Sequence, residues 1–571
     1  MFSPEPKPLI VQSDGSILLD VHDPGASEAR RMLAAIAELE KSPEHVHTYR
    51  LSSLSLWNAA SAGITWKQAV DELNRYSRFP LPKNLCTTIE RTMEAYGSIS
   101  LYETDQDFYL YLLPANHQIF MELKSNKKLQ ELILPLDNAE SIEISVPALT
   151  TTEPFNLGRG FLVPLLHRGT VKQRLLELGY PTRDLAPLKE GDPIEIQLNQ
   201  GPDFQLRDYQ DQAVEAFLGD KKPGTGFGTV VLPCGSGKTI IGMHAIASLA
   251  QETLVLTTST TAVHQWIREL KEKTSIDPDL IGEYTGVKKE IKPITVATYQ
   301  VLVWNKHQEQ AFPHFQIFRS RQWGLLIYDE VHTLPAPVFR ITAELQAVRR
   351  LGLTATLVRE DGLEKEVFAL VGPKRFDIPW KDLEARGWIA EALCVEYRVD
   401  LPEHLHIPYA IAADNEKFRI ASENPRKLEV LENLLEKHQG ESILIIGLYL
   451  DQLKQVAQRF NTPLLTGKTG QKERERVFGA FRDGEIKVIT VSKIANFAID
   501  LPDASIAIQL SGTYGSRQEE AQRLGRILRP KEQQSRFYTI ISKNTREVEF
   551  SANRQQFLTE QGYEYRLENW E

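Results

Sequence analysis

The chain has 571 residues, which is too long for a single hydrophobic core and predicts three or four domains. Its hydrophobic fraction of 42% and mean hydropathy of −0.30 are typical of a soluble globular protein. It contains no apolar run of about 18 residues and no signal-peptide pattern at its start, so we expect a cytoplasmic protein without a membrane partner. The three cysteines are odd in number and widely spaced, which argues against a disulfide framework or a zinc site. A net charge of −10 argues mildly against a protein that coats DNA, but a narrow basic channel is compatible with it.

The first 200 residues predict accessory modules. Two helix-length stretches on either side of Pro80-Leu81-Pro82 give residues 1–104 the pattern of a helical, winged-helix-like module. Short alternating strands dominate residues 105–200, and a further helix is expected to begin near Gly169. We expect this second segment to be a small α+β domain, and an accessory domain that binds nothing fits the pattern as well.

A glycine-rich loop between a strand and a helix predicts a nucleoside triphosphate site. Glycines let backbone amides face phosphates, a lysine reaches the terminal phosphates, and a threonine hydroxyl binds magnesium. Leu232 stands where the full consensus begins with glycine, so the loop alone is a moderate signal. The loop follows the apolar run Thr229–Leu232 and consists of Pro233, Cys234, Gly235, Ser236, Gly237, Lys238 and Thr239.

The segment Leu325–His332 predicts the second half of the same site. A buried-strand run ends there in two adjacent carboxylates, Asp329 and Glu330. At a strand end Asp329 can bind magnesium, and Glu330 can orient or deprotonate the attacking water. An isolated Asp-Glu pair is more often a solvated strand end, but the upstream loop favours the catalytic interpretation. Together the two segments predict an ATPase.

Strand-like and helix-length stretches alternate twice along the chain, which predicts an α/β fold with two tandem parallel-sheet domains. We expect the first over residues 201–378 and the second over residues 379–550, followed by a C-terminal tail at 551–571. One phosphate loop shared by two such domains implies a nucleotide at a cleft, as in a motor. The strand-like runs are Thr253–Leu256, Ile294–Ala297, Leu325–Tyr328 and Leu351–Leu353, then Ser442–Ile446, Lys487–Val491 and Ala504–Ile508.

The second domain offers cationic groups for that nucleotide. Gln522, Arg526 and Arg529 recur at helical spacing, so one helix face carries an amide and two guanidiniums. Such a face suits an arginine finger that stabilises transition-state charge. A solvated basic helix explains the segment alone equally well, and its pairing with Lys238 and Asp329 decides for the catalytic role.

In this order the segments resemble helicase superfamily 2, and within it the XPB-type helicases (xeroderma pigmentosum group B). Leu206–Gln210 is similar to an adenine-reading glutamine motif. Leu351–Asp361 is similar to the stretch that joins a Thr-Ala-Thr motif to an Arg-Glu-Asp element, and Gln509–Gly512 and Arg517–Ala521 are similar to the approach to the arginine helix. The resemblance covers roughly residues 200–550.

The resemblance implies two RecA-like motor domains that use ATP and Mg²⁺ to move 3′ to 5′ along DNA. It implies a role in nucleotide excision repair or, for some members, transcription initiation, with single-stranded, forked or damaged DNA as partner. A nuclease or repair partner would bind through the N-terminal region, which in the family senses distorted DNA, or through a thumb-like segment, and the protein is expected to be a monomer. The implied residues are Arg207, Gln210 and Asp500 for ATP, Thr258, Ser259, Thr298 and Ser492 for DNA phosphates, and Arg359, Glu360 and Asp361 for strand separation.

Each of those serine and threonine hydroxyls fits a helix cap equally well. The segment before Asp500 departs from the family, because Ala495-Asn496 replaces a Gly-Asp step, restricts the backbone and removes a charge. The thumb-like segment Leu401–Leu434 is short. Its basic residues either contact a phosphate chain together with Phe418 or form an exposed helix pair, and they are Lys417, Arg419, Arg426 and Lys427.

Two other functions fit parts of the pattern. A superfamily 2 duplex-DNA translocase in restriction or phage defence shares the same core, but the chain shows no nuclease or methylase signature. A DNA-binding scaffold with a poorly hydrolysing nucleotide site belongs to a different class. Lys238, Glu330 and Arg529 are all present, whereas a decayed site is expected to have lost at least one.

Overall fold

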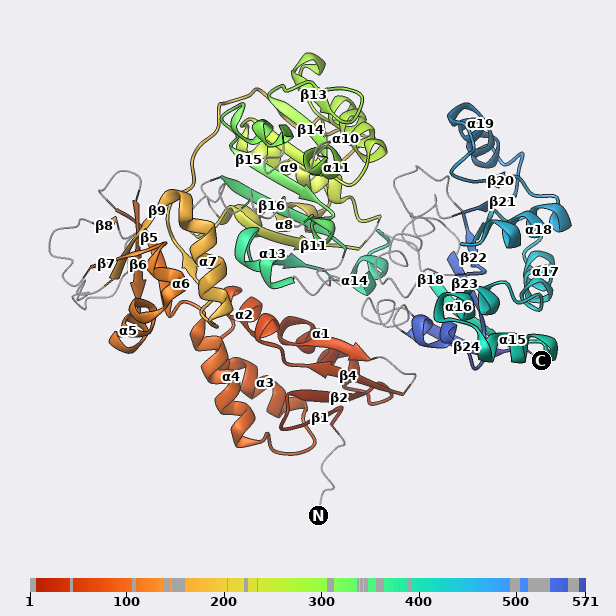
Figure 1. Ribbon diagram of the computed structural model, residues 1–571, viewed down its shortest axis with the longest axis horizontal. Coiled ribbons are helices and arrows are strands. Elements are labelled where there is room, and N and C mark those ends of the chain that lie inside the picture. Colours follow the sequence, from red (N-terminus) through yellow and green to blue (C-terminus); the bar gives the residue numbers. More distant parts are fainter. Residues whose placement is uncertain are drawn as a thin grey trace. The chain divides into compact units, whose positions relative to one another are not determined.

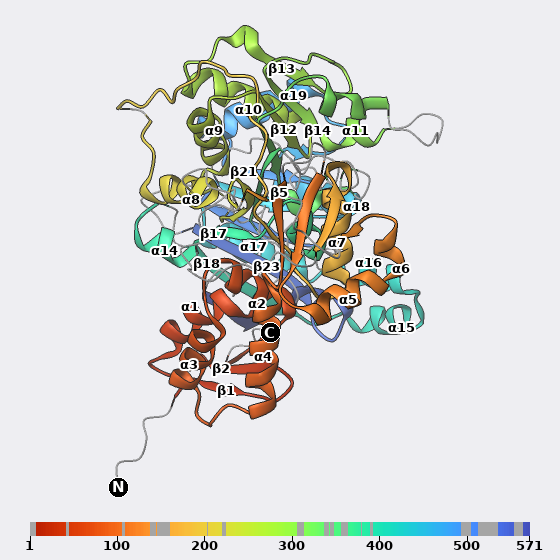
Figure 2. The same cartoon turned by 90° about the vertical axis from the view of Figure 1, so that its left-hand side faces the viewer.

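The structure is a computed structural model of the 571-residue chain (Figures 1 and 2). Contacts divide it into two compact units, Met1–Glu40 with His45–Val231 and Thr239–Asp377, and Lys41–Glu44 with Leu232–Lys238 and Ile378–Glu571. The residues described are 7–41, 45–104, 109–136, 144–145, 160–202, 204–219, 224–233, 235–304, 313–335, 338, 342, 348–355, 364–378, 380–388, 392–492, 504–511, 535–552 and 564–570.

The N-terminal module contains a sheet that the sequence analysis did not predict. Its four strands follow the order β1-β2-β4-β3, and helices cover it with apolar faces that include Leu33, Leu73 and Ile89 (Figure 2). These strands are only three to five residues long, too short for a clear alternating pattern. The elements are β1 (Leu9–Val11), β2 (Ser16–Asp20), α1 (Ala26–Ile36), β3 (Glu38–Lys41), β4 (Val46–Arg50), α2 (Ser53–Ser61), α3 (Trp66–Tyr76) and α4 (Lys83–Ala95).

A second sheet, with the strand order β10-β5-β6-β9-β7 and β8 paired to β5, gives the next segment the expected α+β character. Its first strand, β5 (Ile99–Thr104), lies within the range that the sequence analysis gave to the first module. The other elements are β6 (Tyr109–Pro114), α5 (His117–Ser125), α6 (Lys127–Gln130), β7 (Leu134–Leu136), β8 (Ile144–Ser145), β9 (Gly160–Pro164), α7 (Arg168–Glu177) and β10 (Arg183–Asp184).

Seven parallel strands in the order β13-β14-β12-β15-β16-β11-β17 form the first motor domain and confirm the predicted parallel sheet. The buried strands β11, β12, β14, β15 and β16 read as continuous apolar runs and could be predicted from the sequence, whereas the edge strands β13 and β17 were not predicted. The seven strands are β11 (Phe227–Val231), β12 (Thr253–Thr257), β13 (Ile281–Tyr284), β14 (Ile294–Thr298), β15 (Leu325–Asp329), β16 (Arg349–Thr354) and β17 (Lys374–Asp377), with helices α8 (Asp208–Leu218), α9 (Lys238–Leu249), α10 (Thr260–Lys273), α11 (Tyr299–Val303) and α13 (Glu364–Leu370).

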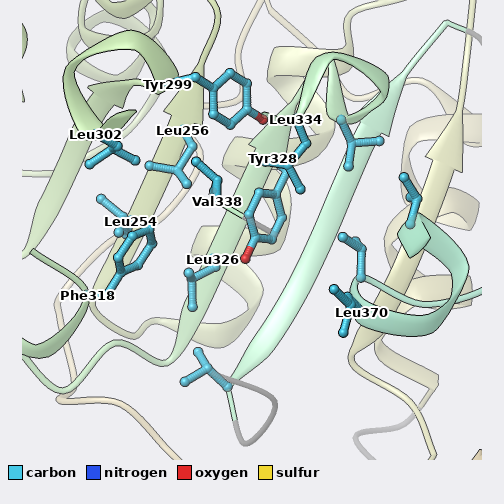
Figure 3. Packing of buried hydrophobic residues seen from close by; sticks show 14 of the residues in the cluster. Leu254, Leu256, Tyr299, Leu302, Phe318, Leu326, Tyr328, Leu334, Val338 and Leu370 are labelled. Atoms are coloured by element: carbon cyan, nitrogen blue, oxygen red, sulfur yellow. The ribbon is translucent and has the colours of Figure 1, made fainter. Parts of the chain in front are cut away.

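One face of this sheet packs against α11, α13 and the 3₁₀ helix Pro313–Arg319 (Figure 3). Leu254 and Leu256 of β12 and Leu326 of β15 form the sheet side of that core. Trp57 of α2 and Leu176 of α7 belong to the same cluster, and the Asn58 Oδ1 accepts a 2.9 Å hydrogen bond from the Lys374 backbone. The N-terminal modules therefore share a hydrophobic core with the first motor domain.

The second unit contains another seven-stranded parallel sheet, in the order β20-β21-β19-β22-β23-β18-β24. The segment 551–571 is not merely a tail, since β24 (Glu564–Asn569) pairs with β18 along the sheet edge. The other elements are α14 (Trp380–Ala385), β18 (Ala392–Val399), β19 (Ile443–Ile446), α18 (Leu450–Phe460), β20 (Leu464–Leu465), α19 (Gln471–Arg482), β21 (Val488–Val491), β22 (Ile506–Gln509) and β23 (Ser535–Ser542).

The thumb-like segment folds as three helices, α15 (Glu403–Ile411), α16 (Asp414–Ser422) and α17 (Lys427–Lys437). Phe418 and Lys427 are buried, so they are not available to a phosphate chain. The Lys427 ammonium instead donates to both carboxylate oxygens of Glu547, each at 2.8 Å, and to the Leu510 carbonyl. Over the described part of the chain, no helix is both long and apolar enough to cross a membrane.

Candidate nucleotide and DNA site

The candidate residues of the first motor domain gather at the carboxyl edge of its sheet. The strand register places Val231, the last residue of β11, beside Thr354 of β16, and places Asp329 of β15 beside Leu353. Ligands of open α/β sheets bind outside the carboxyl ends of the strands. The described residues that directly follow β11, β12, β14, β15 and β16 therefore form the candidate site.

The loop after β11 has the backbone conformation that a phosphate cradle requires. Gly235 and Gly237 have φ angles of +81° and +84°, which a residue with a side chain rarely adopts. The buried Ser236 hydroxyl donates to the Pro233 carbonyl at 2.6 Å and closes the turn. Lys238 and Thr239 then open α9, whose N-terminal amides favour an anion. Cys234 lies outside the described residues.

Asp329 is the last residue of β15 and Glu330 follows it directly, and Glu330 has an unusual backbone. Its φ of +51° and ψ of +55° are left-handed values that are uncommon for a residue other than glycine. Thr333 holds this conformation, because both its amide and its hydroxyl donate to the Glu330 carbonyl at 2.8 Å. Such conformations cost about 1–3 kcal/mol and cluster at functional sites, where they fix the direction of a side chain.

His332 joins the carboxylate segment to the Thr-Ala-Thr segment. Its Nδ1 lies 2.7 Å from the Thr354 hydroxyl and 3.5 Å from a Glu330 carboxylate oxygen. His332 and Thr354 are both buried, at 4% and 0% exposed. The contact links the two segments directly.

The sequence analysis missed two aromatic donors to Asp329. The indole Nε1 of Trp266 in α10 donates to the Asp329 Oδ2 at 2.9 Å, and the Tyr299 hydroxyl at the start of α11 donates to the Asp329 backbone carbonyl at 3.0 Å. Only the position of Tyr299, next to the candidate Thr298, gave a hint in the sequence. Trp266 reads as an ordinary core residue of an amphipathic helix.

The glutamine motif is fixed in the first turn of α8. Gln210 is 3% exposed, and its Oε1 accepts a hydrogen bond of 3.0 Å from the Arg207 backbone amide. The Arg207 guanidinium in turn donates to the Tyr209 hydroxyl at 3.1 Å. This hydrogen bond and the burial of Gln210 fix the position of its amide group.

Two of the four candidate DNA hydroxyls are helix caps. The Ser259 Oγ accepts from the Ala262 amide at the start of α10, and the Thr298 Oγ1 accepts from the Val301 amide at the start of α11. A capping hydroxyl accepts a hydrogen bond through its oxygen, so it can still donate its own hydrogen to a phosphate oxygen. Thr258 follows β12 and is half-buried, and Ser492 follows β21 and is 5% exposed.

The remaining candidate residues lie outside the described part of the chain, so their placement stays a prediction. This set contains Arg359, Glu360 and Asp361 of the Arg-Glu-Asp element, Asp500, and Gln522, Arg526 and Arg529 of the arginine helix.

Three family models match separate parts of the chain. Residues 203–359 match a model described as type III restriction enzyme, res subunit, and residues 383–569 match the ERCC3/RAD25/XPB C-terminal helicase. A third model, described as a helicase conserved C-terminal domain, matches residues 9–136. The first match includes β11 to β16 of the first seven-stranded sheet, and the second includes all strands of the other seven-stranded sheet.

Relatives of known name match almost the whole chain. The DNA 3′-5′ helicase XPB of Kineococcus radiotolerans is 48% identical over 98% of this chain and 96% of its own length. The protein of the same name from Mycobacterium tuberculosis is 47% identical over 98% of this chain and 97% of its own. The general transcription and DNA repair factor IIH helicase/translocase subunit XPB of Encephalitozoon cuniculi is 33% identical over 99% of this chain and 83% of its own.

Proposed function

The chain belongs to the XPB family of DNA 3′-5′ helicases, and we propose that it hydrolyses ATP to move along DNA and separate its strands during nucleotide excision repair. One observation carries the chemical part of this proposal. A glycine loop with left-handed backbone follows β11, and Asp329-Glu330 lies at the end of β15, and both strands belong to the first motor sheet. These are the two halves of a phosphoryl-transfer site.

In this proposal the loop cradles the phosphates of ATP, and Lys238 neutralises the terminal ones. Thr239 and Asp329 would hold Mg²⁺, and the ion would supply a Lewis acid for the transferred phosphoryl group. Glu330 takes the proton of the attacking water. Gln210 recognises adenine, Asp500 contributes to closure around the nucleotide, and Gln522, Arg526 and Arg529 stabilise the transition state from the second motor domain.

We propose DNA contacts that do not depend on base sequence. Hydroxyls at strand ends suit phosphates, because they bind the backbone without reading bases. Thr258, Ser259, Thr298 and Ser492 take this role, and the element Arg359–Asp361 separates strands at a fork. The protein acts in the cytoplasm as a monomer on single-stranded, forked or damaged DNA, with a nuclease or repair partner docked on the N-terminal modules or on the three thumb-like helices.

A duplex translocase of the restriction type remains the second candidate, because residues 203–359 match a restriction-enzyme model. That match covers only the first motor domain, which restriction and repair motors have in common. ATP hydrolysis measured without nucleic acid and with single-stranded, duplex and forked DNA distinguishes the candidates. Stimulation together with separation of a forked duplex supports the helicase, duplex stimulation without separation supports the restriction-type translocase, and the absence of hydrolysis supports a scaffold.

Glu330→Gln tests the chemistry directly. The amide cannot accept the proton of the attacking water, so we expect ATP to bind normally while turnover falls by about 10²-fold or more. Glu473→Gln, on the exposed part of α19, is the matched control and should hydrolyse ATP at the wild-type rate. Turnover by Glu330→Gln near the wild-type rate would contradict the assigned role.

A further inference from the structure

We propose that Trp266 and Tyr299 are positioning residues that set the direction of the Asp329 carboxylate and so determine how tightly the site binds Mg²⁺. This inference rests on the proposed function, which makes Asp329 a magnesium ligand. Neither aromatic residue is expected to touch the metal or the nucleotide. Both act through hydrogen bonds to Asp329.

The two hydrogen bonds restrain different parts of Asp329. The Trp266 indole donates to Oδ2 and fixes the rotation of the carboxylate group, whereas the Tyr299 hydroxyl donates to the backbone carbonyl and fixes the end of β15. Figure 3 shows the Tyr299 ring beside the strand that carries Tyr328, with its hydroxyl turned toward that strand. An aspartate held at its side chain and at its backbone keeps one direction for its metal-facing oxygen.

Both donors are themselves rigid. Trp266 is 1% exposed and Tyr299 is 3% exposed, so neither ring can turn into solvent. Trp266 also packs against α9, the helix that follows the phosphate loop, because the ring edge meets Gly242 with no room for a side chain. The indole therefore lies between α9, the helix that carries Thr239, and the carboxylate of Asp329. Thr239 and Asp329 are the two proposed magnesium ligands.

Hydrogen bonds to a metal-binding carboxylate are known to tune affinity, and their removal typically costs about 10–100-fold in metal binding. The bond from Trp266 goes to a charged oxygen, whereas the bond from Tyr299 goes to a neutral carbonyl, so the indole has the larger effect. Removal of the indole N–H is thus expected to weaken Mg²⁺ binding without removing any group that contacts ATP.

The test is Trp266→Phe, which keeps an aromatic ring and removes the N–H. We expect the Mg²⁺ concentration at half-maximal ATPase to rise by roughly 10-fold or more, while ATP affinity measured without divalent cations stays at the wild-type value. Tyr299→Phe removes only a hydroxyl and should raise the same Mg²⁺ concentration by a few-fold, which keeps the proposal testable if Trp266→Phe folds poorly.

Trp323→Phe and Tyr284→Phe are matched controls. Trp323 is buried in the same domain and donates its indole N–H to the Ile317 carbonyl, and the Tyr284 hydroxyl pairs with His314, so neither contacts Asp329. Both controls should keep the wild-type Mg²⁺ dependence. An unchanged Mg²⁺ requirement in Trp266→Phe and Tyr299→Phe would overturn the positioning role. A wild-type protein without Mg²⁺-dependent ATPase would instead overturn the proposed function, and the positioning role with it.

Discussion

At the scale of single residues, Gly242 occupies a position where any side chain collides with Trp266. A Cβ at this position would lie 2.4 Å from the Cη2 of the indole, closer than real contacts of this kind. The buried ring cannot give way toward solvent. The glycine thus allows α9 to lie directly against the residue that holds Asp329.

We expect Gly242→Ala to lower ATP turnover and to raise the Mg²⁺ requirement, because the new methyl displaces the indole from Asp329. Alanine improves helix propensity by about 1 kcal/mol, but overpacking of a buried contact costs about 1–3 kcal/mol, so stability should stay equal or fall. ATPase assays and thermal unfolding measure the two effects. Gly479→Ala in α19, where a Cβ meets nothing within 4 Å, is the control and should be active and slightly more stable. A fully active Gly242→Ala would show that the indole tolerates displacement.

The residues that the sequence made visible are those that belong to a local pattern. Gly235 and Gly237 stand in a loop between an apolar strand and a helix, and Asp329 and Glu330 end an apolar run, so short-range spacing predicted them. Trp266 is separated from Asp329 by 63 residues, and their hydrogen bond exists only because β12 and β15 are neighbours in the sheet. The left-handed backbone of Glu330 likewise depends on Thr333 rather than on a turn residue.

At the scale of elements, a buried ion cluster fixes α7 against β10. The Asp184 carboxylate accepts from the Arg168 guanidinium at 2.8 and 3.1 Å and from the Lys172 ammonium at 3.0 Å. Arg350 of β16 is also fully buried, and both it and Lys172 lie over the ring of Phe227, the first residue of β11. One carboxylate therefore compensates cations at the junction between the accessory sheet and the strand that leads to the phosphate loop.

Asp184→Asn should destabilise the first unit by about 3–5 kcal/mol, because it leaves Arg168 and Lys172 buried without a counter-charge. The matched control is Glu177→Gln in α7, the helix that also carries Arg168 and Lys172. This change breaks an exposed ion pair with Arg174 and should change the free energy of unfolding by less than about 1 kcal/mol. Thermal and denaturant unfolding of the full chain measure both. Equal stabilities of the two variants would show that the cluster contributes no more than a surface pair.

The same cluster makes the folding stability of the first unit depend on pH. Burial by itself raises the pKa of Asp184, but the nearby Arg168 and Lys172 charges outweigh burial and hold this pKa well below its usual range. The stabilisation is therefore fully present above the unfolded value of about 3.9 and is lost as the pH falls from there toward the folded pKa. Asp184→Asn should accordingly flatten the fall in stability below about pH 4.

A helix or strand could be predicted from the sequence where the burial of its faces produces a clear hydrophobic pattern. Central motor strands such as β12 and β15 are buried on both faces and read as apolar runs, whereas the three- to five-residue strands of the N-terminal sheet leave no clear alternation. The edge strand β24 carries charged residues, and the sequence predicts a tail there. Lys427 shows a further limit, because its partner Glu547 lies 120 residues away and turns an apparent DNA-contact lysine into a buried structural one.

At the scale of the whole molecule, the net charge of −10 opposes the approach of DNA, which is itself an anion. A motor that moves along DNA of any base sequence must still bind the phosphate backbone with similar energy at every position. The candidate hydroxyls and backbone amides at strand ends meet that requirement, but they release few counterions. The affinity must therefore depend on a limited number of basic side chains along the DNA track.

The salt dependence of DNA binding measures how many phosphates these basic side chains neutralise. The logarithm of the DNA-binding constant should fall linearly with the logarithm of salt concentration, with a slope of about −0.7 for each phosphate neutralised on a single strand. The slope should be the same for strands of different sequence, because phosphate contacts carry no base information. Fluorescence anisotropy with labelled single strands of mixed and homopolymeric sequence, across a salt series, gives both quantities. A flat response to salt would contradict a phosphate-bound track and favour a protein substrate, and a strong preference for one sequence would contradict a translocase that reads only the backbone.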